Sequence, residues 1–431
     1  MRILLINPPN CGRSIPEEEY GIATIKAIFR GEPLSLETLA AECDGHEVDI
    51  LDLKVEPEAL GDRLRNFAPD LVGITGMTCE ANGMLAIAGQ AKNLGVRHVV
   101  VGGHHASNDP EYFNKPGVDW VSIGLGSAGF SRLVQALERG EQPEIPWMAR
   151  VREPGRALEW RRRPFSQEDL GEGRPPRYDL VNKYRDHYVM AGTKARIGFV
   201  VSAMGCTHAC SFCAIPNLTS GRYLVRSPEA VARDIESLDT PYVRLVDANT
   251  FGRPEQAALL CRELAEKGLR RKYLVDVRAD TVVNQPGLMK EWKAAGLAAA
   301  IIGLEEIDDE RLRRMNKRSS TEQNRKAIAI LKDIGVMVVG DFIVNPDYSA
   351  EDFSRLDDYI RETGVDLPIP SILTPMPGTA LHRQMRDRIT NHNLDYYTFS
   401  NAVVPTRMPE PEFYGAYAAL VHRAHAHLRK P

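Results

Sequence analysis

The feature that most restricts the possible folds is a run of cysteines in the middle of the chain. Three of the seven cysteines, Cys206, Cys210 and Cys213, have the spacing C-x3-C-x2-C. Thiols this close cannot all pair as disulfides, and an odd total argues against a disulfide framework. A tight loop of this kind can hold metal instead. Zinc needs a fourth ligand, for which His208 is the nearest side chain, whereas a four-iron cluster on three cysteines leaves one iron open to a further ligand. We favour the cluster, because zinc sites more often use two separated C-x2-C pairs.

The first 140 residues alternate between short apolar strands and helical segments. Alternation with short connections predicts a Rossmann-like, doubly wound parallel sheet over residues 1–140. In such sheets ligands bind at the carboxyl ends of the strands, and glycines there allow close approach. The residues expected at that edge are Asn7, Pro8, Thr75, Gly76, Met77, Gly102, Gly103, His104, His105, Gly124 and Gly126.

The rest of the chain divides into three further segments. Residues 141–195 interrupt the alternation with Pro, Arg and Glu, and we interpret them as a crossover linker that packs on both halves, because Tyr184 and Tyr188 are among several apolar anchors. From 196 to 373 six strand–helix units predict a partial (β/α)6 barrel of the TIM type, with its chemistry at the carboxyl ends of the strands. Residues 374–431 are less regular and are assigned to a C-terminal substrate and closing region.

The tail holds the few sequence clues to a substrate. Residues 395–399 and 402–409 mix aromatic and apolar side chains. They either line a pocket for a hydrophobic molecule, such as a terpenoid or a tetrapyrrole, or fill a core, and we favour the core. Glu412–Arg429 predicts a closing helix.

The cysteine motif, with Phe212 before its last cysteine and a predicted strand before its first, resembles the signature of the radical S-adenosylmethionine (SAM) superfamily. The resemblance implies that the three cysteines ligate a [4Fe-4S] cluster whose open iron binds SAM, and that Phe212 contacts the adenine. Other positions that are similar to SAM-binding positions of the family follow later barrel strands: Asp247, Asn249, Arg278 and Glu305. Each also has a structural interpretation as a helix cap or an ion pair.

An N-terminal sheet of this kind joined to such a barrel resembles the cobalamin-binding subfamily of radical SAM enzymes. The matching phrases are GHEVDILD at 45–52, VGIT at 72–75 and GGHHA at 102–106. The resemblance implies that the edge residues named above contact cobalamin. One departure is GLGS at 124–127, where the subfamily often has GEGE. His46 is not expected to ligate cobalt, because it precedes the second strand and so belongs to the opposite edge of the sheet.

The resemblance implies a methyltransferase that methylates an unactivated carbon of a small or hydrophobic substrate, by way of methylcobalamin and a 5′-deoxyadenosyl radical. The C-terminal region faintly resembles that of hopanoid C-3 methylases. Two alternatives stay open. One is a cyclase, or a ring-rearranging or oxidising enzyme, with the same cofactors. The other is a protein that binds an iron–sulfur cluster, or uses one as a sensor, without catalytic turnover.

Composition limits the partners. The formal net charge is -4 and the pI is about 6.3, which argues against nucleic acid as the main partner. No apolar run approaches the roughly 20 residues of a membrane span, and the N-terminus lacks the features of a signal peptide. We therefore expect a cytoplasmic protein without a transmembrane segment. We also expect an external electron donor, such as a flavodoxin or a ferredoxin.

Overall fold

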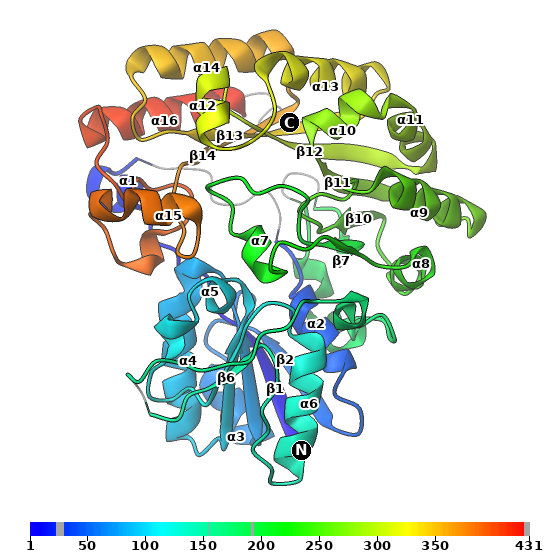
Figure 1. Ribbon diagram of the computed structural model, residues 1–431, viewed down its shortest axis with the longest axis vertical. Helices are drawn as coiled ribbons and strands as arrows, with labels where there is room; N and C mark the ends of the chain where they lie inside the picture. Colours follow the sequence, from blue (N-terminus) through cyan, green and yellow to red (C-terminus); the bar gives the residue numbers. More distant parts are fainter. Residues whose placement is uncertain (23–29, 154, 191–193, 426–431) are drawn as a thin grey trace.

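The computed structural model describes residues 1–22, 30–153, 155–190 and 194–425. Two six-stranded sheets lie one above the other along the long axis, with the N-terminal sheet below and the barrel sheet above (Figure 1). The predicted combination of a doubly wound sheet and a partial barrel is therefore observed. No helix among these residues has the length and apolar character needed to cross a bilayer.

The N-terminal sheet has the strand order β2-β1-β3-β4-β5-β6. Its strands are β1 (Arg2–Asn7), β2 (Glu47–Asp52), β3 (Leu71–Thr75), β4 (His98–Gly102), β5 (Trp120–Ser122) and β6 (Met148–Arg150). The first five are parallel and largely buried, as expected for strands covered on both faces. The short antiparallel β6 was not predicted, and it pairs with the edge strand β5 from within the crossover.

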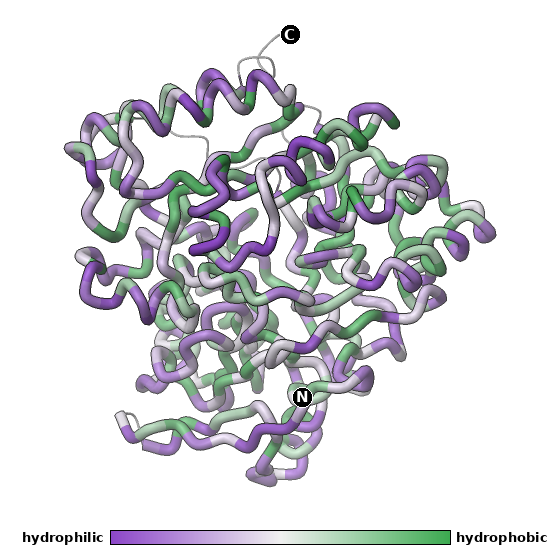
Figure 2. Tube along the Cα trace, turned by 45° about the horizontal axis from the view of Figure 1, so that its top comes forward, coloured by the Kyte–Doolittle hydropathy of each residue, from purple (hydrophilic) through white to green (hydrophobic). Residues whose placement is uncertain are grey.

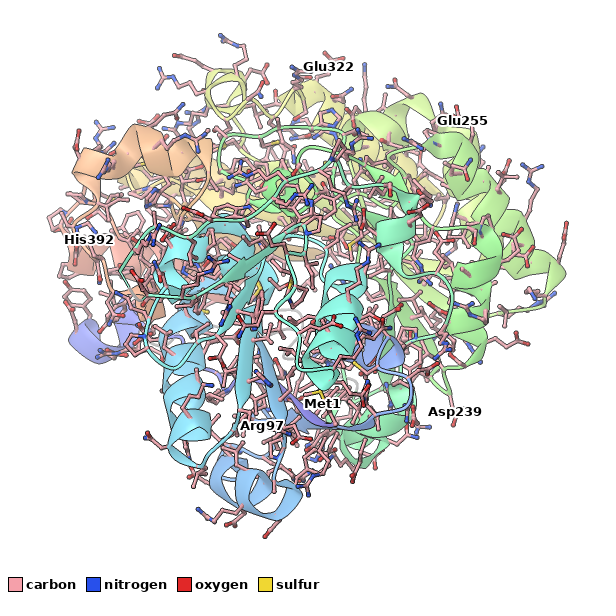
Figure 3. The ribbon with its side chains drawn as sticks, turned by 60° about the horizontal axis from the view of Figure 1, so that its bottom comes forward. Met1, Arg97, Asp239, Glu255, Glu322 and His392 are labelled. Carbon is pink, nitrogen blue, oxygen red and sulfur yellow. The ribbon has the colours of Figure 1, made fainter. Side chains whose placement is uncertain are left out.

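Helices cover both faces of this sheet. They are α2 (Leu34–Ala41), α3 (Leu60–Phe67), α4 (Ala81–Asn93), α5 (Gly103–Asn108) and α6 (Ser127–Glu138), whereas α1 (Ile15–Tyr20) packs against the C-terminal helix of the chain. Side chains of α2 and α6 share one apolar cluster with the sheet, and those of α3 and α4 share another on the opposite face. The order of the strands reverses between β1 and β3, which is where ligands bind in such sheets. Met1 and Arg97, which precede β1 and β4, mark the far, amino-terminal ends of the strands in Figure 3.

The second sheet has the all-parallel order β14-β13-β12-β11-β10-β7. Its strands are β7 (Ile197–Val200), β10 (Tyr242–Leu245), β11 (Lys272–Val277), β12 (Leu297–Glu305), β13 (Met337–Val344) and β14 (Leu367–Ile372). These correspond to the six strand–helix units predicted between residues 196 and 373. A small ladder of β8 (Ala203–Met204) and β9 (Leu224–Val225) flanks the cysteine loop.

Most helices of the barrel lie on the outer, convex side of the sheet, whereas the short α7 (Ile215–Leu218) lies between the two sheets next to α5 (Figure 1). The other helices of this half and of the tail are α8 (Pro228–Glu236), α9 (Pro254–Glu266), α10 (Ala279–Asn284), α11 (Pro286–Ala295), α12 (Asp309–Arg314), α13 (Thr321–Asp333), α14 (Ala350–Thr363), α15 (Ala380–Met385) and α16 (Glu410–Ala424). Hydrophilic residues gather on their outer turns, and hydrophobic residues on the sheet and the inner turns (Figure 2). Glu255 and Glu322 point outward from this helical layer in Figure 3.

The crossover and the tail both contact the two sheets. Tyr188 is fully buried in the core of the N-terminal sheet, while the Tyr178 hydroxyl donates to the carbonyl oxygen of Phe199 on β7 at 3.0 Å. The tail returns to the N-terminal sheet, where Tyr397 and Val403 lie in its core. Tyr397 and Val403 therefore fill a core, as we favoured, whereas Phe399 of the same stretch is exposed. The predicted closing helix is α16, and the predicted end at Arg429 lies outside the described residues.

Candidate functional site

A cavity of about 320 Å³ lies where the carboxyl edge of the N-terminal sheet faces the barrel. Its walls come from the ends of β3 to β5, from α2, from the crossover and from barrel loops that contribute Val201, Met204 and Leu218. Six of the predicted edge residues line it: Thr75, Gly102, Gly103, His104, Gly124 and Gly126. Both sheets therefore build one site, and the sequence predicted the N-terminal half of its wall.

Two glycines let the backbone come close at this edge. Gly103 has a φ of +88°, and a Cβ there would overlap Thr75 Oγ1 and lie 2.8 Å from the backbone nitrogen of Gly76. Gly124 has a φ of +74°, and a Cβ there would lie 2.8 Å from the carbonyl oxygen of Leu218 in the barrel. Both positions thus require glycine because of their conformation and their protein neighbours.

The two adjacent histidines have different surroundings. His104 lines the cavity, and its Nδ1 is buried without a hydrogen-bond partner among the described residues. Burial lowers the pKa of His104, so the neutral ring can accept or donate one bond to a ligand. His105 is instead fully buried, with its ring edge-on to Tyr112 and Phe113 at 5.0 and 5.6 Å between centroids. We therefore remove His105 from the candidate contacts, because α5 turns it into the core.

The remaining predicted edge residues do not line the cavity. The Asn7 side-chain amide donates to Asp52 Oδ1 at 2.8 Å, so it is already satisfied within the sheet. Met77 follows β3 and keeps 44% of its surface exposed outside the cavity. The other two are Pro8 and Gly76. His46 lies against the N-terminal amine, 3.1 Å away, at the opposite edge of the sheet, as predicted.

The three motif cysteines lie on the loop after β7 and β8. Gly205 precedes them with a φ of +87°, and a Cβ there would overlap the carbonyl oxygen of Arg222, so the turn into the loop requires glycine. All three are partly accessible. Burial, together with the neighbouring Cys210 and Cys206, raises the pKa of Cys213 to about 12, so the thiols lie within electrostatic reach of one another. A donor set of three neighbouring thiols fits an iron–sulfur cluster with three cysteine ligands.

The zinc alternative gains no support from the geometry. The ring of His208 bonds to Thr207 Oγ1 at 2.9 Å and lies 3.7 Å from Asp280. In the part of the chain that the structure describes, no three His, Cys, Asp or Glu side chains, the three loop thiols included, converge closely enough to hold a single metal ion. His208 is therefore not in place as a fourth ligand.

Phe212 lies over the carboxyl ends of the last barrel strands. It packs against an apolar cluster of Ile343, Met315 and Leu373, so the cysteine loop covers the ends of β13 and β14. The loop is also held by the backbone, because Ser211 N donates to the carbonyl oxygen of Met315 at 2.9 Å. This placement agrees with a position next to a ligand at the barrel mouth.

The four predicted SAM-binding residues that follow later barrel strands all lie at carboxyl ends of those strands. They differ in whether protein groups already satisfy their polar atoms. The Asp247 carboxylate accepts hydrogen bonds from the backbone nitrogens of Ser202 and Ala203, each at 2.8 Å, so it anchors the start of the cysteine loop. Arg278 donates to Asp280 at 3.1 Å and to the carbonyl oxygen of Lys317 at 3.0 Å. Both groups are satisfied by protein partners, which gives them positioning roles.

Asn249 keeps an acceptor atom without a partner in the described part of the chain, whereas Glu305 is held in an ion pair. Asn249 is 1% exposed, and its Oδ1 has no hydrogen-bond partner within the described ranges. Glu305 has a φ of +63°, which is strained for a residue with a side chain, and it accepts from Lys317 Nζ at 2.6 Å.

Sequence reasoning missed Lys317. This lysine is buried, and its charge, like that of Arg278, opposes the rise that burial causes in the pKa of Cys210. It therefore links the cysteine loop to Glu305. Three charged side chains within the barrel strands were missed as well: Arg244, Asp276 and Asp341. A charged residue inside an otherwise apolar parallel strand is the signal that would have found them.

Comparison with known proteins agrees with this arrangement. The B12 binding domain model matches residues 21–134, and the radical SAM superfamily model matches residues 200–360. The chain is 30% identical over 401 residues to a hopanoid C-3 methylase of Methylococcus capsulatus, covering 90% of this chain and 76% of the relative. It is 24% identical over 376 residues to an anaerobic magnesium-protoporphyrin IX monomethyl ester cyclase of Rubrivivax gelatinosus, covering 84% and 66%.

The fold matches a solved structure along its whole length. The radical SAM methyltransferase TsrM from Kitasatospora setae, with cobalamin and a [4Fe-4S] cluster bound, has a TM-score of 0.73 at 17% identity, covering 100% of this chain and 91% of that one. The matches confirm the predicted pairing of a cobalamin domain with a radical SAM domain, and with it the predicted cofactors. The chain belongs to the family of cobalamin-dependent radical SAM enzymes.

Proposed function

We propose that this enzyme transfers a methyl group to an unactivated carbon of a hydrophobic, polycyclic substrate. The observation that carries the proposal is the shared cavity, whose walls combine the ligand edge of the cobalamin domain with the first barrel loops. When bound, cobalamin supplies the methyl group, and the cluster with SAM supplies the radical that removes a hydrogen atom. A chain that builds one wall from each domain can hold both cofactors against one substrate carbon.

The chain's own residues hold and orient the cofactors and enclose the site. Cys206, Cys210 and Cys213 would ligate the cluster, and Asp247 keeps the start of their loop in place through the backbone of Ser202 and Ala203. His104, whose Nδ1 has no protein partner in the described chain, would bond a polar group of cobalamin. Removal of a hydrogen atom by a radical requires no general base, so we assign no acid–base pair to the reaction.

Apolar side chains keep water away from the shared cavity. Its walls include Leu36 and Leu39 of α2, Phe130 of α6 and Leu170 of the crossover. Excluding water protects a reactive intermediate from side reactions. An apolar enclosure also supports a hydrophobic substrate, of the hopanoid or tetrapyrrole type that the names of the relatives indicate. We further propose that an external low-potential protein, such as a flavodoxin or a ferredoxin, reduces the cluster.

The test is a mass measurement on the product. Protein loaded anaerobically with cluster and cobalamin is incubated with a reductant, methyl-deuterated SAM and a panel of pentacyclic triterpenoids and tetrapyrroles. We expect one acceptor to gain a single labelled methyl group, and the variant with all three loop cysteines replaced by alanine to give none. The competing cyclase activity, which similarity to the ester cyclase favours, would instead give a product without the label.

A further inference from the structure

The concave face of the barrel sheet carries charged side chains at positions where a packed core would be apolar. On β13, Phe342 points outward and packs on Tyr359 of α14, with 6.1 Å between the ring centroids. Because side chains alternate along a strand, Asp341 points to the opposite, inner side. Arg244 on β10 and Asp276 on β11 are also inward, where they form an ion pair at 2.7 Å.

Other protein groups do not fully cover these inward side chains. The Arg244 and Asp276 side chains keep 15% and 22% of their surface accessible although they lie within the sheet, and Asp341 is partly accessible too. The strands around them contribute inward apolar residues that are each almost completely buried: Leu274, Ile301, Val339 and Ile343. Phe212 of the cysteine loop packs against the cluster that contains Ile343, so these inward residues lie beneath that loop.

Two cations act on Asp341 among the residues that the structure describes, and each is already bound to another acid. Arg244 pairs with Asp276, and Lys317 pairs with Glu305 at 2.6 Å. The second pair lies beside Asp341, because Gly303 is the direct neighbour of Asp341 on β12 and a Cβ there would lie 2.7 Å from Lys317 Nζ. On β14 the direct neighbour is Ile369, which is apolar.

Asp341 is therefore a surplus carboxyl. It has no hydrogen bond or ion pair with any residue that the structure describes. Burial, together with Glu305 and Asp276, raises the pKa of Asp341 to about 8, so near neutral pH it is mostly an uncharged acid. An uncharged carboxyl can donate one hydrogen bond and accept others, and leaving it unsatisfied in an enclosed space is costly.

We propose that Asp341 is a specificity-determining residue that hydrogen-bonds a hydroxyl group of the substrate, so that the enzyme selects a polycyclic alcohol over the corresponding hydrocarbon. The inference rests on the proposed function and deepens it. A hydroxyl both donates and accepts, and it satisfies the acid without changing its charge, whereas a cationic ligand would require the acid to lose its proton. The apolar side chains around Asp341 contact the carbon skeleton.

The test is a binding comparison on protein loaded with cluster and cobalamin. The probes are a pentacyclic triterpenoid alcohol and the hydrocarbon of the same skeleton, both in detergent micelles. We expect the wild-type protein to bind the alcohol about tenfold more tightly, as one satisfied hydrogen bond in an enclosed site allows. Asp341→Asn, which keeps a donor and an acceptor, should keep that preference, and Asp341→Leu should bind both probes alike. Asp239→Asn, at an exposed position, is the control.

Several outcomes would overturn the inference. The wild-type protein could bind the two probes equally, or bind neither. The preference for the alcohol could survive in Asp341→Leu, or be lost in Asp341→Asn as fully as in Asp341→Leu. Equilibrium dialysis with SAM gives a further check. A large loss of SAM affinity in Asp341→Leu would show that Asp341 binds SAM rather than the substrate. Methyl transfer is scored separately. If the enzyme transfers a methyl group but does not prefer the alcohol, only this inference fails. If it prefers the alcohol but transfers no methyl group, only the proposed function fails.

Discussion

Replacing Gly103 by alanine tests whether the tight edge of the N-terminal sheet sets the affinity for cobalamin. At a φ of +88°, a side chain costs about 1 kcal/mol, and the new Cβ would overlap Thr75 Oγ1 and lie 2.8 Å from Gly76 N. Relieving such an overlap by moving α5 costs about 1–3 kcal/mol more. Because His104 follows directly and lines the cavity, that movement displaces the cofactor wall. We expect cobalamin to bind about 10- to 100-fold more weakly.

The assay is a spectrophotometric titration of the cluster-loaded protein with hydroxocobalamin. Gly89→Ala is the matched control, because Gly89 lies within α4 and a Cβ there has no atom within 4 Å outside its own helix. We expect Gly89→Ala to bind cobalamin normally and to be more stable by about 0.5–1 kcal/mol. Wild-type affinity in Gly103→Ala, or an equal loss in both variants, would refute the reasoning.

The remaining predictions concern the barrel. Replacing any one of the three loop cysteines by alanine should abolish the absorption of the four-iron cluster in the reconstituted protein, and a full cluster in such a variant would contradict the assignment. Lys317→Met should lower the free energy of unfolding in urea by about 3 kcal/mol, because it leaves Glu305 buried and unpaired, and adding Glu305→Gln should restore much of the loss. The raised pKa of Asp341, about 8 against an ordinary 3.8, means that the folded state retains a proton that the unfolded state releases. Wild-type stability should therefore fall between about pH 4 and pH 8, by about 1.4 kcal/mol per pH unit, and Asp341→Asn should lack this fall in urea titrations at several pH values. An equal pH dependence in both proteins would show that Asp341 is ionised at neutral pH.

The sequence predicted the strands well, for a physical reason. Buried parallel strands appear in the sequence as short apolar runs between helices, as at the observed β3 and β4, so the alternation was visible over residues 1–140. The edge strand β6 has three residues, and a run that short carries no periodic signal. It pairs only because the crossover passes along β5.

Side-chain direction at the site was harder to predict. His104 and His105 are neighbours in the sequence, and only the first turn of α5 decides that one lines the cavity and the other enters the core. The inward direction of Asp341 likewise depends on the pairing of β13 with β12, which shifts register between Gly303 and Glu305. Pairing of this kind depends on contacts between distant segments, which no local pattern contains.

The return of the tail to the first sheet has a consequence for how the protein is made. Leu394, Tyr397 and Val403 complete the core of a sheet whose own strands end at Arg150. Asn401 also accepts a hydrogen bond from the backbone nitrogen of Ile15 at 2.8 Å. The N-terminal sheet therefore finishes folding only after the tail residues up to Val403 have been synthesised. A fragment that ends after the barrel strands would expose this unfinished core, and we expect it to aggregate on expression.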